Sequence, residues 1–449
     1  MSASLFEKLY GTAVVAKHLL REWRVPYLSD DAIGHIRDQR LRQIVDYAAA
    51  TVPFYRDFFD QRGVDPADIQ SVDDLERLPL IDRETVRKQP QAFVSQSKWG
   101  REAIPFATSG STGTPLTVFH DRYSLLANVA IGQREKEVDR QVLGRGGRRR
   151  KLSIGPAQAT TGEKAAAWIR KISFVPAGRR RGRISFLDPI ERIIEVINER
   201  RPAVISCFAG SYLEMLFKTV AARGLRMHLP RAATYRGDAL SDAGRRLIEE
   251  DFGVRVLSRY NAVEAFKIGF TCEERTGFHL HDDLTHVRIV DPQGQALPPG
   301  ERGEVVISNL FNRGTVLLNY RLGDVASLCQ ERCHCGRNLR LLSSLEGRTG
   351  DLIYRPDGRF VHYAAIWWVF NVRRDVLQYQ LIQHEMERFE LKVVTPDRAT
   401  FDAIVGDLID ELRRLLGESA VVEAAYHERL EPSAGGKFRP VLSLVEPDW

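Results

Sequence analysis

After about residue 100, short apolar runs alternate with segments of helical spacing. The apolar runs at 204–208, 232–235 and 254–257 are typical of buried strands. A helix follows the first run, and a second helix, capped by Ser241 and ending near Phe252, follows the second run. Because strands that are joined through helices pair in parallel, this order predicts an α/β fold with parallel sheets.

The chain before and after this region has different patterns. Residues 1–90 are mostly helical, with Ser71 and Asp82 as the expected caps of two helices. From about 284 the chain becomes β-rich, and the expected strands there are 286–291, 303–308 and 316–320. Because 449 residues are too many for one core, we expect a large N-terminal domain over 1–347, with parallel sheets and a β-rich subdomain, and a small α+β C-terminal domain over 348–449.

The formal charge of +6, from 65 basic and 59 acidic residues, is concentrated in two runs at 145–151 and 179–183. Solvated loops explain such runs, and attraction of an anionic substrate or a membrane surface is the functional alternative. No aromatic residues interleave with the charge, so nucleic acid is not an expected partner.

No apolar run is as long as a membrane-spanning helix, which needs about 18 residues, and residues 1–10 lack a secretory pattern. We expect a cytoplasmic protein, as a monomer or homodimer.

A cluster of hydroxyl and glycine residues follows an expected strand at 105–108. Its members are Ser109, Gly110, Ser111, Thr112, Gly113, Thr114 and Pro115. Glycines allow the backbone to come close to a phosphate, and hydroxyl and N–H groups can surround anionic oxygens. The Gly-Lys-Ser/Thr ending of the P-loop of nucleotide triphosphatases is missing. Taken alone, the cluster fits either a phosphate site or a flexible surface loop.

Five further motifs follow this loop. They are Gly237-Asp238-Ala239-Leu240, Tyr260-Asn261-Ala262-Val263-Glu264, Tyr320-Arg321-Leu322-Gly323-Asp324, Gly347-Arg348-Thr349-Gly350-Asp351 and Gly435-Gly436-Lys437-Phe438-Arg439. Together with the loop, the series resembles the adenylate-forming superfamily of acyl-CoA synthetases. Residues 48–87 are similar to the phenylacetate-CoA ligase branch. The segment 378–383 and the Gly-Lys-Phe-Arg string are similar to branch members associated with capsular polysaccharide biosynthesis.

The resemblance implies an enzyme that binds ATP and Mg²⁺ and activates a small carboxylic acid. The carboxylate attacks the α-phosphate, and pyrophosphate leaves, so positioning and charge stabilisation dominate the catalysis. The loop 109–113 would hold the β- and γ-phosphates, and Gly237 and Asp238 would lie next to the adenine. Tyr260 and Asn261 would belong to the same nucleotide site. Asn261 also replaces the usual glycine and would narrow the mouth of the pocket for the carboxylic acid.

The charged residues of these motifs take the remaining implied roles. Glu264 would bind Mg²⁺, which prefers oxygen ligands, and Asp324 would accept both ribose hydroxyls. Arg348 would pair with phosphate or ribose oxygens, and Lys437 would stabilise negative charge on the α-phosphate and the substrate carboxylate. Taken singly, the three residues Glu264, Asp324 and Lys437 fit a helix-start acid, a turn aspartate and a solvated lysine. Their order along the chain favours the enzymatic interpretation.

The resemblance also implies a second step. A mobile C-terminal domain would rotate after adenylation, so that the acyl group passes to coenzyme A as a thioester. Two alternatives stay open: transfer to an amine, a hydroxyl or a carrier protein in polysaccharide or secondary-metabolite biosynthesis, and a catalytically silent nucleotide-binding protein. Gly350 replaces the usual hinge acid, and a glycine can absorb the dihedral change that a hinge requires.

Four of the five cysteines lie in the β-rich part of the chain, close to histidines. Sets of four thiolate and imidazole ligands suit tetrahedral zinc, and we predict a structural Zn²⁺ held by Cys272, His279, Cys333 and Cys335. The competing ligands are His281, Cys329 and His334. Reduced thiols without a metal are the alternative. Similar Cys/His sets occur in the resembled branch, which favours the metal. Its expected role is to fix the β-rich subdomain to the loop after Glu264.

Overall fold

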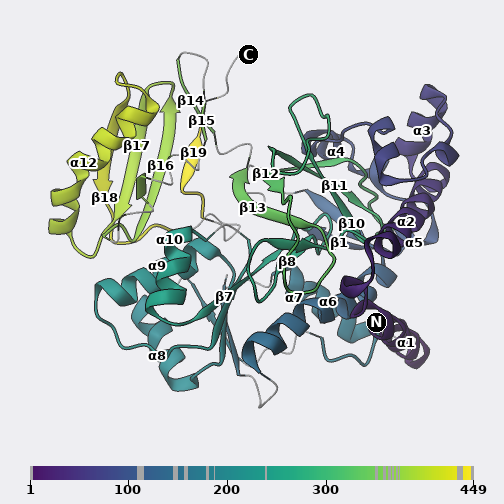
Figure 1. Cartoon of the computed structure of the whole chain (residues 1–449), viewed down its shortest axis with the longest axis horizontal. Coiled ribbons are helices and arrows are strands. Elements are labelled where there is room, and N and C mark those ends of the chain that lie inside the picture. Colours follow the sequence, from purple (N-terminus) through teal and green to yellow (C-terminus); the bar gives the residue numbers. More distant parts are fainter. Residues whose placement is uncertain are drawn as a thin grey trace. The chain divides into compact units, whose positions relative to one another are not determined.

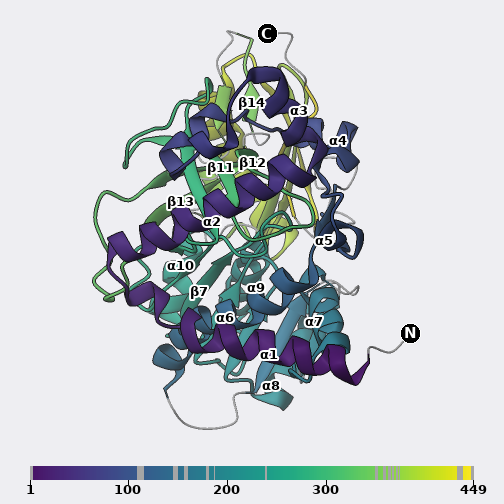
Figure 2. The same ribbon diagram turned by 90° about the vertical axis from the view of Figure 1, so that its right-hand side faces the viewer.

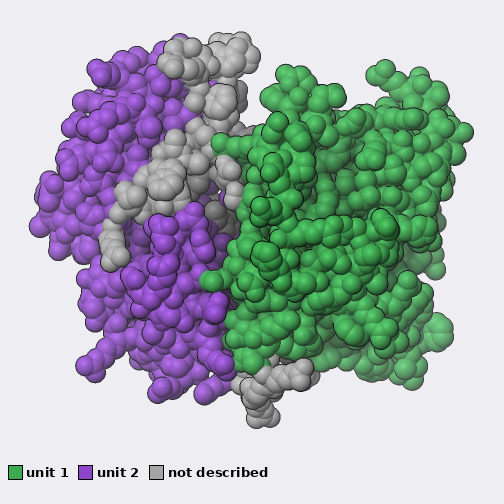
Figure 3. Space-filling model, in the orientation of Figure 1, with its two compact units in different colours: residues 1–146, 158–179, 257–344 green, residues 147–157, 180–256, 345–449 purple. Residues whose placement is uncertain are grey.

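The structure is a computed structural model that describes residues 4–108, 116–144, 150–155, 160–177, 182–186, 188–237, 240–348, 352–356, 360–362, 366, 369–370, 373, 375–431 and 438–445. The chain divides into two compact units (Figure 3). Unit 1 consists of residues 1–146, 158–179 and 257–344, and unit 2 consists of residues 147–157, 180–256 and 345–449. The predicted domain boundary at 347/348 falls on the last two residues of a strand and stays a prediction.

The first part of unit 1 is helical, as predicted. Its helices are α1 (Leu5–Glu22), α2 (Asp30–Thr51), α3 (Pro53–Arg62), α4 (Arg83–Lys88) and α5 (Lys98–Arg101), with short 3₁₀ helices at Val25–Tyr27, Pro66–Asp68, Val72–Arg77 and Pro90–Phe93. Two longer helices, α6 (Arg122–Leu143) and α7 (Thr161–Ile172), complete the unit. Ser71 forms a capping box with Asp74, and Asp82 caps α4 by accepting a bond from Thr85 N. Both predicted caps are therefore confirmed, although the first precedes a 3₁₀ helix.

The strands of unit 1 form a hairpin and a larger sheet. The hairpin pairs β1 (Ile104–Ala107) with β2 (Thr117–His120). The sheet contains β7 (Arg255–Tyr260), β8 (Gly269–Thr271), β9 (Phe278–Leu280), β10 (Thr285–Val290), β11 (Arg302–Asn309), β12 (Tyr320–Leu328) and β13 (Leu341–Arg348), in the order β10-β11-β12-β13-β9-β8-β7. The pairings β10–β11, β11–β12 and β7–β8–β9–β13 are antiparallel, which confirms the β-rich region.

One predicted strand is wrong. Residues 316–319 lie outside the strands, and β12 begins only at Tyr320. Asn319 has a left-handed backbone with φ of 52°, which interrupts an extended run. Its side-chain amide donates to Leu75 O and Leu78 O, so the segment is held against the 3₁₀ helix at 72–77.

Unit 2 contains the predicted parallel sheet. Its strands are β3 (Lys151–Gly155), β4 (Arg183–Ser185), β5 (Val204–Cys207) and β6 (Ala232–Tyr235), in the order β4-β3-β5-β6, with every pair parallel. The helices α8 (Ile190–Arg200), α9 (Gly210–Ala222) and α10 (Asp242–Arg246) lie beside these strands (Figure 1), and α10 continues as a π-helix over Leu247–Asp251. Ser241 caps α10 through Gly244 N, as predicted. Apolar residues of the strands and helices share one core, which includes Ile205, Leu213 and Ile248.

The C-terminal part of unit 2 is the predicted α+β fold. Its strands are β14 (Leu352–Tyr354), β15 (Phe360–His362), β16 (Gln378–Glu385), β17 (Arg388–Val394), β18 (Val421–Tyr426) and β19 (Val441–Ser443), and β16 to β19 form a sheet in the order β18-β17-β16-β19. The helix α12 (Arg398–Leu416) packs on this sheet (Figure 1). It buries Phe401, Leu408, Leu412 and Leu416, whose spacing defines one helical face.

A buried arginine ties distant segments of unit 1 together. The side chain of Arg134 on α6 is 0% exposed. It donates to Glu22 at the end of α1 and forms two bonds, of 2.7 and 2.9 Å, with Asp283 in the turn before β10. Arg40 on α2 donates to the same carboxylate at 2.8 Å. Burial alone would raise the pKa of Asp283, but Arg134 and Arg40 hold it well below its usual range.

We expect Arg134→Met to lower the free energy of unfolding by about 3 kcal/mol, because Glu22 and Asp283 stay buried but lose the cation that pairs with both of them. Arg140→Ala on the same helix is the matched control. Arg140 forms an exposed pair with Glu137, so its loss should change the free energy of unfolding by less than about 0.5 kcal/mol. Urea denaturation measures both values. Equal shifts in the two variants would contradict the anchoring role of Arg134.

Candidate active site and metal centre

The predicted phosphate loop connects the two strands of the β1–β2 hairpin. Ser109, Gly110, Ser111, Thr112 and Gly113 lie outside the described residues. The two residues at its ends, Thr108 and Leu116, are held together, because each donates its backbone N–H to the other: Thr108 N to Leu116 O at 2.8 Å, and Leu116 N to Thr108 Oγ1 at 2.9 Å. The hairpin therefore closes the base of the loop.

Two of the motifs are joined by crossed hydrogen bonds. Tyr260, at the end of β7, donates its hydroxyl to Asp324 Oδ2 at 2.6 Å. Tyr320, at the start of β12, donates its hydroxyl to Glu264 Oε1 at 3.4 Å. Each motif thus supplies one tyrosine and one acid, and each tyrosine binds the acid of the other motif. Glu264 and both tyrosines are buried, and Asp324 is half-buried. The bond between Tyr320 and Glu264 is therefore shielded from water, and the two bonds together orient the two carboxylates.

The loop that contains Glu264 is fixed on both sides of the acid. Asn261, with its amide nitrogen facing two carbonyls, donates to Tyr260 O and Phe266 O, and so closes the loop. His120 on β2 donates from Nε2 to Val263 O at 2.7 Å, and its ring packs 4.2 Å from the ring of Phe266. Burial lowers the pKa of His120 to about 4, so the ring is neutral near pH 7. Phe266 has a φ of 61°, which is uncommon for a bulky residue.

Sequence reasoning missed the role of Arg83. One guanidinium nitrogen, Nη2, donates to Thr108 Oγ1 at 2.8 Å, and another, Nη1, lies 3.8 Å from Glu264 Oε1. Arg83 therefore links the base of the phosphate loop to the predicted Mg²⁺ ligand. Asn309 was also missed, and its amide donates to Glu264 O at 3.1 Å. The only sequence signal for Arg83 was its place after the cap Asp82, which predicted a helix start and nothing more.

The remaining predicted nucleotide residues belong to unit 2. Gly237 follows β6 with a φ of 99°, and an added Cβ would lie 2.7 Å from Phe208 O, which follows β5. This position needs glycine and lies at the carboxyl end of two parallel strands, where α/β sheets bind ligands. Arg348 is the last residue of β13. Its side chain, together with Asp238 and Lys437, lies outside the described residues, and the roles of all three stay predictions.

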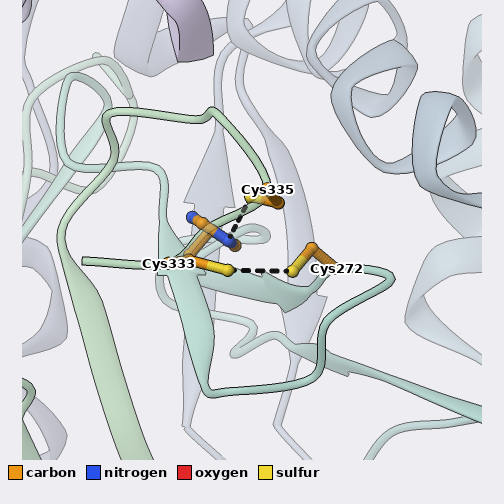
Figure 4. A group of neighbouring side chains, drawn as sticks. Cys272, Cys333 and Cys335 are labelled. Atoms are coloured by element: carbon orange, nitrogen blue, oxygen red, sulfur yellow. Dashed lines mark hydrogen bonds between the residues drawn. The ribbon is translucent and has the colours of Figure 1, made fainter. Parts of the chain in front are cut away.

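The predicted zinc ligands come together in unit 1. Cys272 follows β8, His279 lies on β9, and Cys333 and Cys335 lie in the connection from β12 to β13. Their donor atoms all lie within 4.8 Å of one another. Figure 4 shows the thiols of Cys272 and Cys333 facing each other at 3.5 Å, and Cys335 Sγ lies 3.3 Å from His279 Nε2. Zn–S and Zn–N bonds of about 2.3 and 2.0 Å imply tetrahedron edges of about 3.5–3.8 Å. The donor set therefore fits a tetrahedral metal.

The competing ligands are placed elsewhere. His281 packs beside Arg134 and Glu135, and burial lowers its pKa to about 4. His334 is exposed, and Cys329 packs in the same cluster as Cys272 and Cys333 but lies outside the group of four close donor atoms. The connection that bears Cys333 and Cys335 is itself anchored by Arg337, which binds Glu273 through two bonds of 2.9 and 3.0 Å.

Comparisons with known proteins agree with this arrangement. No family model matches the chain. The phenylacetate-coenzyme A ligase of Thermus thermophilus is 28% identical over 338 residues, which cover 73% of this chain and 72% of that protein. Protein CapK of Staphylococcus aureus is 18% identical over 99% of this chain and 97% of its own length. The crystal structure of 2-hydroxyisobutyryl-CoA ligase in the postadenylation state matches with a TM-score of 0.74 and 19% identity, over 94% of this chain and 91% of that one.

The chain therefore shares the fold of 2-hydroxyisobutyryl-CoA ligase and is similar in sequence to phenylacetate-coenzyme A ligases over most of its length, in agreement with the predicted resemblance. Its curated relatives include phenylacetate-coenzyme A ligases and CapK, which are the kinds of protein that the N-terminal and C-terminal motifs resemble.

We expect Gly237→Ala to lower the free energy of unfolding of unit 2 by about 2–4 kcal/mol. The alanine would have a strained φ, and its Cβ would clash with a backbone oxygen. Gly253→Ala is the matched control. Gly253 has a φ of 66° with no atom within 4 Å of the added Cβ, so it should cost only about 1–2 kcal/mol for the left-handed backbone. Chemical denaturation of the two variants measures the difference. An equal loss of unfolding free energy in the two variants would show that the backbone at Phe208 moves to accommodate the Cβ of alanine.

Proposed function

We propose that this protein activates a carboxylic acid with ATP as an acyl adenylate, releases pyrophosphate, and transfers the acyl group to the thiol of coenzyme A. The crossed pairing of Tyr260 with Asp324 and of Tyr320 with Glu264 supports this proposal most directly. It holds two carboxylates in fixed orientations within a chain whose curated relatives include phenylacetate-coenzyme A ligases.

We assign the ribose hydroxyls to Asp324. A carboxylate has two oxygens and about four lone-pair sites, so the bond from Tyr260 orients the group without exhausting its capacity to accept. We assign the β- and γ-phosphates to the loop 109–113, whose base is closed by Thr108 and Leu116. Preorganised N–H and hydroxyl donors there would stabilise the charge of departing pyrophosphate without reorganisation.

We assign Mg²⁺ to Glu264. One carboxylate together with substrate phosphates is a common Mg²⁺ donor set, and Glu264 lies beside Arg83, which contacts the base of the loop. A bound Mg²⁺ would neutralise phosphate charge. Gly237 and Asp238 are assigned to the adenine, and Arg348 to phosphate or ribose oxygens. Lys437 is assigned to the α-phosphate and the attacking carboxylate, where its charge offsets the negative charge that builds as the new bond forms.

The reaction is tested by carboxylate-dependent exchange of pyrophosphate into ATP over a library of acids, with and without coenzyme A. We expect exchange with at least one acid, and coenzyme A consumption only with acids that support exchange. Lys437→Ala should reduce exchange about 10²–10³-fold. Lys392→Ala, a lysine on β17 that pairs with Glu390, is the matched control and should keep full activity.

Other outcomes separate the alternatives. Exchange without coenzyme A consumption would favour an amine, hydroxyl or carrier-protein acceptor. Tight ATP binding without exchange for any acid would contradict the enzymatic proposal and favour a silent nucleotide-binding protein. Pyrophosphate exchange at the wild-type rate in Lys437→Ala would contradict the role that we assign to Lys437.

We also propose that Cys272, His279, Cys333 and Cys335 hold one structural Zn²⁺. Their thiolate and imidazole donors have the composition and spacing that zinc prefers, and four protein ligands leave no position for a substrate. The metal would join the β8–β9 hairpin to the start of β13, the strand that ends at Arg348.

We expect about one zinc per purified chain, measured by inductively coupled plasma mass spectrometry, and a fall of at least about 5 °C in the melting temperature after chelation. Cys335→Ser should lose the zinc. Cys207→Ser, which changes a buried cysteine in unit 2, is the control and should keep it. A metal-free wild-type protein with an unchanged melting temperature after chelation would instead support reduced thiols.

A further inference from the structure

The first helix of unit 1 leaves an apolar face in solvent. Helix α1 packs one side on α6 and α7 and buries Gly11, Val14 and Val15 there. His18 Nε2 lies 2.8 Å from the hydroxyl of Tyr123, and Phe174 N donates to Thr12 Oγ1 at 3.0 Å, so the helix is held in place. Figure 2 shows α1 lying in front of α6, with its outer side uncovered by other described elements in that view.

The outer side is a continuous apolar stripe. Six exposed residues repeat at intervals of three and four, which places them on one face of the helix: Phe6, Leu9, Ala13, Ala16, Leu20 and Trp23. Phe6 is 78% exposed, Leu20 is 74% exposed and Trp23 is 50% exposed, and Leu5 and Tyr10 extend the stripe at its start. With aromatic side chains of about 150–250 Å² each, the exposed apolar area is on the order of 600 Å². That equals the largest patches of ordinary monomers, about 300–600 Å².

Basic side chains border this stripe. Lys17 and Arg21 are exposed on α1, and Arg24 is exposed just after its end. The Arg24 guanidinium lies 5.0 Å from the ring centre of Trp23. Lys8 Nζ lies 5.7 Å from the ring centre of the exposed Phe174, which follows α7. Of the two acids of α1, Glu22 is buried with Arg134, and Glu7 lies 3.5 Å from Arg122. The uncovered side therefore combines apolar area with net positive charge.

We propose that this face of α1 binds the surface of an anionic lipid bilayer, with the helix lying in the plane of the interface. Aromatic residues and leucines on one side, with lysines and arginines at the border, are the composition of interfacial helices. The apolar stripe would enter the headgroup boundary, and Lys17, Arg21 and Arg24 would contact anionic headgroups. No helix among the described residues is long and apolar enough to cross a membrane, so this is binding to a surface.

Charge favours a bilayer over a second copy of the chain. A two-fold interface brings the same patch of both copies together. Here both copies would bring Lys17, Arg21 and Arg24 into one interface, and the combined positive charge would oppose association. An anionic surface instead attracts each of these side chains.

The experiment uses the full chain and sedimentation with two kinds of vesicle: phosphatidylcholine alone, and phosphatidylcholine with about one third phosphatidylglycerol. We expect binding to the anionic vesicles to be at least about tenfold tighter than to the neutral ones, and to weaken in about 0.5 M salt. The double variant Phe6→Glu/Leu20→Glu should lose binding at least about tenfold. Lys17→Glu/Arg21→Glu should lose the preference for anionic vesicles.

Leu229→Glu changes an exposed leucine of unit 2 and is the matched control, which should bind as the wild type does. Melting temperatures of all variants should match the wild type, because the changed side chains are exposed. No binding of the wild type to either vesicle, or equal binding of wild type and Phe6→Glu/Leu20→Glu, would overturn the proposal. A dimer that dissociates in Phe6→Glu/Leu20→Glu, without vesicle binding by the wild type, would assign the face to a second copy.

Discussion

The candidate site depends on two hydrogen bonds that cross between motifs far apart in the chain. Tyr260 and Asp324 are 64 residues apart, and Tyr320 and Glu264 are 56 residues apart. Because each acid takes its orientation from the tyrosine of the other motif, neither motif can form its half of the site alone. Tyr320 also begins β12 at the point where Asn319 turns the backbone, so the fold of the β-rich region decides where Glu264 points. Arg83 extends the same arrangement to the base of the phosphate loop.

The cysteine and histidine cluster lies beyond the carboxyl ends of β8 and β12, whereas Tyr320 lies at the start of β12. It lies where β8, β9 and the connection to β13 meet, and Arg337 holds that connection through Glu273. Tyr260 lies at the end of β7, which pairs with β8, and Asp324 lies within β12. A metal at the cluster would therefore stiffen the strands that carry the crossed pairs, without contacting them. A structural role of this kind is consistent with four protein ligands, which leave no open coordination position for a substrate.

Order along the chain was enough to predict the α/β class, the parallel sheet of unit 2 and the C-terminal α+β fold, because these follow from hydrophobic spacing. The four predicted ligands Cys272, His279, Cys333 and Cys335 also come together in the structure, with donor atoms within 4.8 Å of one another, and their binding of a metal stays a proposal. The turn at Asn319 could not be predicted, because residues 316–320 have an apolar pattern that only the contact with Leu75 and Leu78 interrupts. Arg83 was missed for a similar reason. Its contacts to Thr108 and Glu264 join segments 25 and 181 residues away, and nothing in its local sequence reports them.

The bonds of Arg134 also limit the order in which the protein can be made. Glu22 lies 112 residues before Arg134, and Asp283 lies 149 residues after it. A ribosome that adds about 5–20 residues per second needs roughly 7–30 s to reach Asp283 once Arg134 has been made. During most of that interval α1 and α6 are complete and Glu22 is present, while Asp283, which accepts two bonds from the arginine, has not been synthesised. Unit 1 therefore cannot reach its final packing until most of unit 2's parallel strands have been synthesised. The N-terminal helices therefore complete their packing only after the segments of unit 2 that separate them from Asp283 in the sequence have been made.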